Sequence, residues 1–249
     1  GSAPAAVARL LEQVWTPAKK RAADERAALS AMAASRGEAS AIEPWDWRYY
    51  AEKVRQVRYA VDDSVVKPYF PLERVVDAAF DCAQRLFGLR FVARPEIVAY
   101  HPDVRVYEVH GRDDRLVGVF LHDNVARPTK RGGAWMSAYR LQSRIAGDVL
   151  PIIVNNNNFA KGAPGEPTLL SLDDALTLFH EFGHGLHGLL SQVTFESLSG
   201  TQVLRDFVEL PSQIFENWLL EPQVLKRHAR HVETGEPMPA ELRERFIAA

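Results

Sequence analysis

The chain has 249 residues, of which 47% are hydrophobic and 25% charged, and its formal net charge is −2. This composition is typical of a globular protein with a real core. The lack of a Lys/Arg surplus argues against nucleic acid as a partner, and no apolar run is long enough to predict a membrane span. The single cysteine, Cys82, excludes an internal disulfide and a cysteine-based zinc site, so we expect it to be buried as a small hydrophobe.

Helices are predicted in the first third of the chain. Gly1 and Ser2 are interpreted as an expression scar. Residues 3–40 are expected to form an N-terminal helical segment, with one or two solvent-facing helices over 5–36. Amphipathic helices follow at 45–61 and 71–88, the second of which begins with proline and ends with glycine.

Short segments rich in β-branched and aromatic residues come next. They predict four or five strands of a small, mostly antiparallel sheet, at 91–100, 104–111, 115–123, 133–141 and 150–156. Helical texture returns at residue 172 and is expected to last to the end of the chain. The order of helices, sheet and helices predicts an α+β fold that is mainly helical.

The sequence HEFGH at 180–184 fits the pattern H-E-x-x-H. His180 and His184 are one helical turn apart on one face, so their imidazoles can meet at one Zn²⁺ ion. Glu181 flanks that face and can reach a zinc-activated water without becoming a ligand. It would take the proton of this water as general base and later pass it to the leaving amine.

A zinc site of this kind needs a third protein ligand. His187 lies on the same face as His180, but two turns separate them, about 10.5 Å at 1.5 Å per residue, so we expect a supporting or structural role. The metzincin pattern would require glycine at position 187 and histidine at 190, so that class is excluded. Residues 205–218, RDFVELPSQIFENW, predict a second amphipathic helix that carries a better candidate, Glu209. A metal would satisfy this carboxylate in its apolar context.

Two further carboxylates on the predicted 205–218 helix have competing interpretations. Asp206 could hold the other ring nitrogen of a ligand histidine or cap the helix N-terminus, and the two are equally weighted. Glu216 is interpreted as an ordinary surface carboxylate rather than a ligand.

Long ordered motifs in this chain resemble the M3 family of zinc metallopeptidases, the thimet oligopeptidase family. FHEFGHGLH is followed, 29 positions after its first histidine, by the glutamate of RDFVELPSQIFENW. The segments PWDWRYYAEKVR, ARPTKRGGAWM, LSGTQVLRDFVELPSQ and HARHVETGEPMPAEL are similar to the bacterial peptidyl-dipeptidase branch in particular. The resemblance covers the chain from about residue 40 to its end, so we expect residues 41–249 to form the zinc-binding catalytic core.

The resemblance implies one Zn²⁺ held by His180, His184 and Glu209, a gluzincin arrangement, with Glu181 as the base. It implies a peptidase that removes C-terminal dipeptides from short, unstructured peptides. The alternatives are an oligopeptidase that cuts internally and a non-catalytic zinc-stabilised fragment. A cytoplasmic location is expected, with the periplasm left open because the natural N-terminus is taken to be missing.

Family members are longer, and their C-terminal part supplies histidine and tyrosine side chains that stabilise the oxyanion. No segment of that kind follows Glu209, and no tyrosine follows Tyr139. The resemblance therefore predicts that this chain is the central fragment of an enzyme, truncated at both ends, that binds zinc but has weak or no activity. Self-association through newly exposed surface is expected.

Overall fold

The computed structural model describes residues 3–38, 41–59 and 63–248, so Gly1 and Ser2, interpreted as an expression scar, lie outside the described residues. The chain divides into two compact units, residues 63–240 and a unit made of residues 1–62 with 241–249. The helix at 47–59 therefore belongs with the N-terminal helix, whereas the sequence placed the division near residue 40. No helix among the described residues is long and apolar enough to cross a membrane.

The smaller unit is helical. Helix α1 (Pro4–Ser35) is continuous through Pro17, where the sequence left one or two helices open. It packs against α2 (Trp47–Tyr59) through a small core formed by Leu29, Ala33, Ile42 and Tyr50. Helix α8 (Ala240–Ala248) belongs almost entirely to the same unit.

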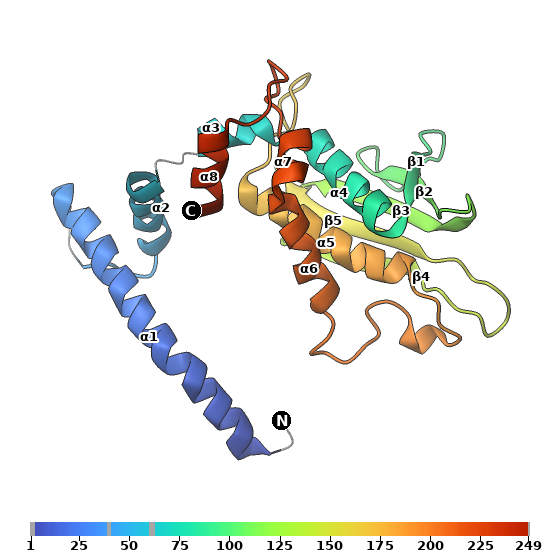
Figure 1. Cartoon of the computed structure of the whole chain (residues 1–249), viewed down its shortest axis with the longest axis horizontal. Coiled ribbons are helices and arrows are strands. Elements are labelled where there is room, and N and C mark those ends of the chain that lie inside the picture. The colour runs from blue at the N-terminus through green and yellow to red at the C-terminus, as the bar shows by residue number, and fades with distance from the viewer. Residues whose placement is uncertain (1–2, 39–40, 60–62, 249) are drawn as a thin grey trace. The chain divides into compact units, whose positions relative to one another are not determined.

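The larger unit holds a five-stranded sheet and most of the remaining helices (Figure 1). The strands are β1 (Arg90–Ala93), β2 (Arg105–His110), β3 (Leu116–Val125), β4 (Trp135–Arg140) and β5 (Ile152–Phe159). The helices are α3 (Asp63–Val66), α4 (Leu72–Phe87), α5 (Leu172–Leu189), α6 (Leu210–Leu220) and α7 (Pro222–His228). Two 3₁₀ turns, Lys67–Tyr69 and Glu196–Leu198, complete the described elements of this unit.

The sheet order is β1-β2-β3-β5-β4. Three of the pairings are antiparallel, but β3 and β5 run parallel, with Phe120 opposite Ile153 and His122 opposite Asn155. The prediction of a mainly helical α+β fold is confirmed, and the sheet is mixed, although antiparallel pairings predominate. The parallel pair arises because β4 takes the edge position and β5 returns between it and β3.

Three predicted elements are wrong in extent. The strand predicted at 91–100 ends at Ala93, and the residues after it form turns around Pro95. The helical texture from 172 to the end is interrupted at residues 190–209, which are irregular apart from the short 3₁₀ turn, and again at 229–239. Helix α6 begins at Leu210 instead of Arg205, because Pro211 lies in its first turn and favours a helix start there.

Aromatic side chains fasten the helices to the sheet. Phe80 of α4 stacks on Phe91 of β1 with ring centroids 4.1 Å apart, and Phe182 of α5 lies 5.5 Å from both Phe80 and Phe120. Each such pair adds about 0.5–1.5 kcal/mol beyond its buried area. Cys82 of α4 is buried at 3% exposure, which confirms the prediction that it is a core residue. The aromatic contacts of Phe182 with Phe80 and Phe120 pack α5, the helix with the HEFGH sequence, against α4 and the sheet.

Candidate metal centre

Helix α5 begins with a capping box. Ser171 Oγ accepts from the backbone N–H of Asp174 at 3.1 Å, while the Asp174 carboxylate accepts from the Ser171 N–H at 3.0 Å. This reciprocal pair satisfies two backbone donors and fixes where the helix starts. The helical register is thereby set eight residues before the first histidine of the motif.

Glycines on α5 allow unusually close packing on two sides. A Cβ at Gly183 would lie 2.7 Å from the Ser212 Cα, and one at Gly188 would lie 2.7 Å from the Ile153 Cδ1. Real Cβ atoms essentially never approach backbone so closely, so only glycine fits at position 183, where α5 meets α6. At Gly188 a larger residue would force the end of the Ile153 side chain to move. The close crossing at Gly183 brings the start of α6, and with it Glu209, next to the histidine face of α5.

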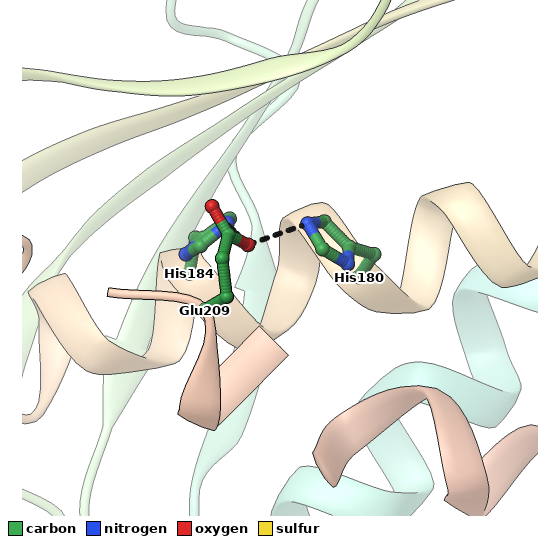
Figure 2. A group of neighbouring side chains, drawn as sticks. All are labelled: His180, His184 and Glu209. Carbon is green, nitrogen blue, oxygen red and sulfur yellow. Dashed lines mark ion pairs between the residues drawn. The ribbon is translucent and has the colours of Figure 1, made fainter. Parts of the chain in front are cut away.

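Three side chains converge at this crossing. Glu209 Oε2 lies 3.2 Å from His180 Nε2 and 3.1 Å from His184 Nε2. Figure 2 shows the carboxylate facing both rings from the turn that precedes α6. One ligand atom from each residue lies within 4.8 Å of the others, the geometry of a group that could hold a metal ion.

The donor set fits a divalent metal. Ligand atoms about 2.0–2.1 Å from a tetrahedral zinc ion stand roughly 3.3 Å apart, close to the separations found here. Two imidazole nitrogens and a carboxylate oxygen are also the ligand types of catalytic zinc sites, in which a fourth position stays open. Without a cation or a shared proton, these atoms would face one another as acceptors.

Glu209 is held in place by its own helix. Ser212 Oγ lies 3.0 Å from Glu209 Oε2 and 2.9 Å from its backbone oxygen, and it donates to this residue. Partial burial raises the pKa of Glu209, but the Ser212 hydroxyl and the two histidines outweigh it, so the net shift is downward. The carboxylate is therefore kept ionised, as a metal ligand must be.

Glu216 contacts the other side of His180. Its Oε1 lies within hydrogen-bond distance of His180 Nδ1, which corrects the expectation that Glu216 is an ordinary surface carboxylate. It stands seven residues after Glu209, two turns along the same helix, a spacing that could have suggested a second contact with α5. The carboxylate fixes the ring tautomer and leaves Nε2 free to face Glu209.

Glu181 is buried beside these histidines. It is 6% exposed, and its Oε2 has no hydrogen-bond partner among the described residues. Burial raises its pKa to about 7, with a smaller upward effect from Glu209 and an opposing effect from His180. His184 is 8% exposed, and its Nδ1 likewise lacks a partner there; burial lowers the pKa of this ring.

The two remaining sequence candidates lie apart from the convergence. Asp206 is exposed and makes no hydrogen bond or ion pair with the residues that the structure describes, so Glu216 occupies the place considered for it. His187 packs edge-on against Phe207 at 6.2 Å and lines an apolar cavity of about 400 Å³ between α4, α5 and α6. Its burial lowers its pKa.

Comparison with known proteins gives one consistent result. The sequence matches Peptidase family M3 over residues 2–249. It is 44% identical to dipeptidyl carboxypeptidases of Salmonella typhimurium and Escherichia coli, over 99% and 98% of this chain and 36% of each relative. It is 39% identical to oligopeptidase A of Escherichia coli, over 99% of this chain and 37% of that protein. The chain thus spans about a third of the length of these relatives.

Proposed function

Because the chain belongs to peptidase family M3, we propose that it forms the metal-binding, catalytic part of a zinc-dependent peptidase that releases C-terminal dipeptides from short, unstructured peptides. The observation that carries this proposal is the convergence of His180, His184 and Glu209 beside the buried carboxyl of Glu181. The dipeptide specificity rests on the 44% identity to relatives that are named dipeptidyl carboxypeptidases.

Each residue has a distinct role in the proposal. A zinc ion bound by His180, His184 and Glu209 would polarise the scissile carbonyl and lower the pKa of a water to about 7. Glu181 accepts the proton of the attacking water on its carboxylate and delivers it to the leaving amine. Its burial excludes bulk water from this transfer. Glu216 keeps His180 oriented with Nε2 toward the metal.

The edge strand β4 offers a way to align the substrate. It pairs with β5 on one side only, and Ser137, Ala138, Tyr139 and Arg140 are exposed. An extended peptide could add to this edge through backbone hydrogen bonds, which read no particular side chain.

The second candidate is an oligopeptidase that cuts internally. The 39% identity to oligopeptidase A over almost the whole chain favours it. The two candidates share the metal centre and the base, so they differ in where the substrate is anchored. The masses of the products separate them.

The rate of the 249-residue chain alone is proposed to be low. The chain covers only about a third of its relatives, and each oxyanion donor supplied from outside it would be missed at a cost of about 10²–10³ in rate. A cytoplasmic location and self-association belong to the same proposal. Sedimentation over a range of concentrations tests the latter.

The experiment compares the zinc-loaded chain with Glu181→Gln, His184→Ala and, as matched control, the exposed Glu221→Gln. Each is incubated with an N-terminally blocked hexapeptide, and zinc content and product masses are measured. Glu181→Gln should bind one zinc per chain and lose all cleavage, whereas His184→Ala should lose zinc as well. Successive losses of dipeptides support the dipeptidyl activity, and a single internal cut supports the oligopeptidase.

Two results would overturn the peptidase proposal. Chains that bind no zinc would remove the metal centre. Unchanged cleavage by Glu181→Gln would show that this carboxyl is not the base. Zinc binding without any cleavage would favour the remaining hypothesis, that the chain is a zinc-stabilised but non-catalytic fragment.

A further inference from the structure

A polar cavity lies at the end of the sheet where β2 begins and β3 ends. It has a volume of about 180 Å³ and is lined by residues from α4, β2, β3 and the segments at 102–103 and 161–168. None of its lining residues belongs to the metal centre. Ligand binding in this cavity would therefore be separate from the proposed peptidase function.

Three of the buried residues that line this cavity are polar, beside the apolar Val76 and Leu72. His122, Asn124 and Tyr107 line it and are 2%, 7% and 8% exposed. The Nε2 atom of His122 has no hydrogen-bond partner among the described residues, although an unpaired buried group of this kind costs about 1–3 kcal/mol. Burial lowers the pKa of His122 to about 3, so the ring is neutral and offers one donor and one acceptor.

The rim carries two cations and two carboxylates. Arg105 pairs with Glu73, and Lys161 Nζ lies 2.5 Å from Asp103 Oδ1. The side chains of Arg105 and Glu73 are each 57% exposed, and Lys161 is 59% exposed. Such surface pairs contribute about 0–1 kcal/mol, so a ligand can replace either partner at little cost. The two charges of each sign cancel, which disfavours a simple anion or a simple cation as the ligand.

The N-terminus of α4 adds a favourable place for a carboxylate. Leu72 and Glu73 of its first turn line the cavity, and Pro71 provides no side-chain cap. Leu72 N–H donates to Thr168, but in the described part of the chain the N–H groups of Glu73 and Arg74 have no acceptor. Uncapped N–H groups at a helix start favour a negative group.

We propose that this cavity binds a small zwitterion, the charge pattern of a free amino acid or a dipeptide. Its carboxylate would lie toward Arg105, Lys161 and the start of α4, and its ammonium toward the carboxylates of Glu73 and Asp103. The side-chain amide of Asn124 would contact the polar atoms between these ends. The volume of about 180 Å³ suits a ligand of this size.

The test is calorimetric titration of the metal-free chain, kept in a chelator so that the metal centre cannot contribute. The probes are alanylalanine, its N-acetylated form, its C-terminal amide, free alanine and inorganic phosphate. Alanylalanine or alanine should bind with one site per chain, and each blocked dipeptide should bind at least about tenfold more weakly, because one charge-assisted contact is lost. The tighter of the two unblocked probes identifies the source of the zwitterion.

Variants locate the binding. Arg105→Gln and Lys161→Gln should each weaken it by about tenfold. Arg90→Gln, which removes an exposed cation paired with Asp114 outside the cavity, should not change it. The inference is overturned by the absence of saturable binding, by equal binding of the blocked dipeptides, by binding of phosphate alone, or by unchanged binding in both cavity variants. Zinc content and peptide cleavage are measured separately, so failure here leaves the proposed function untouched.

Discussion

The carboxylates of Asp123 and of Glu209, both in the larger unit, have opposite surroundings. Asp123, at the end of β3, is fully buried, and both of its oxygens are occupied: Arg127 donates to them at 2.7 and 2.8 Å, Lys130 at 3.1 Å and Tyr100 at 2.9 Å. At the metal centre, the Glu209 oxygen faces two imidazole nitrogens, and the neighbouring Glu181 Oε2 has no partner among the described residues. The cluster of Asp123, Arg127, Lys130 and Tyr100 is complete, because the chain supplies a donor for each carboxylate oxygen. The group of His180, His184, Glu209 and Glu181 has more acceptors than donors.

The difference separates a cluster whose charges are compensated within the chain from a group of side chains that could hold a metal ion. Although burial raises the pKa of Asp123, the Arg127, Lys130 and Tyr100 contacts outweigh this and lower it overall. The charge is therefore compensated by cations of the chain itself, and the cluster ties the loop after β3 to the sheet. At the candidate metal centre, a bound metal ion would supply a compensating charge that the chain itself does not place there. Both regions contain carboxyl groups with shifted pKa values, so the shifts alone do not distinguish them. The number of hydrogen-bond donors around each carboxylate does.

The largest expected effect comes from breaking the complete cluster. Asp123→Asn leaves the charges of Arg127 and Lys130 uncompensated in a buried place, so it should destabilise the chain by about 3–5 kcal/mol. The measurement is urea unfolding followed by circular dichroism. Asp114→Asn removes a carboxylate that is 78% exposed and paired with Arg90, and it should leave the unfolding midpoint unchanged. A loss from Asp123→Asn no greater than that of the control would show that the cluster is not structural.

The second effect sharpens the description of the metal centre. Glu216→Gln removes the carboxylate that contacts His180 Nδ1 without removing a ligand, so zinc affinity should fall by about ten- to a hundredfold, or roughly 1.4–2.7 kcal/mol. Competition with a chromophoric chelator measures the dissociation constant. The exposed Glu221→Gln is the matched control on the same stretch of chain. Equal affinities for both variants would leave Glu216 with no role in positioning.

Local patterns made the convergence of His180, His184 and Glu209 partly predictable. His180 and His184 are four apart, so helical geometry alone places them together, and Glu209 followed from its apolar context and from the resemblance to M3 peptidases. Glu216 was missed because its contact depends on how closely α5 and α6 cross. That distance is set by Gly183 against Ser212, two residues that are far apart in the sequence.

The complete cluster could not be predicted at all. Asp123 lies near the end of β3 in the sequence FLHDN, which gives no sign that Tyr100, Arg127 and Lys130 surround it. These partners come from loops whose paths depend on tertiary packing. The parallel pairing of β3 with β5 was missed for a related reason, because hydrophobic pattern identifies strands but does not fix their order in the sheet. A spacing of four residues, such as that of His180 and His184, depends only on the local helix. Strand order and contacts between loops depend on residues far apart in the sequence.

The smallest effect concerns His122, which is next to Asp123 in the sequence. Like Glu181 beside the candidate metal centre, it is buried and has a polar atom without a partner among the described residues. His122 Nε2 has no partner in the described residues, and burial, aided by Arg105 and Lys130 and opposed by Asp123, lowers its pKa from 6.5 to about 3. Because the folded pKa is the lower one, the unfolded chain binds the proton more strongly between these values, and stability falls as the pH is lowered below about 6.5. The loss should be about 1 kcal/mol at pH 6 and about 2 kcal/mol at pH 5.

Urea unfolding between pH 8 and pH 5 measures this slope, with His122→Gln as the test variant and His101→Gln, at a half-buried position, as the control. His122→Gln removes the titrating ring, so its stability should change less over this range than that of the parent chain. Equal slopes would mean that the His122 proton is accommodated in the folded state. In that case a donor or acceptor in the folded chain already pairs with the His122 ring. His122 would then resemble Asp123, whose partners all come from the chain itself.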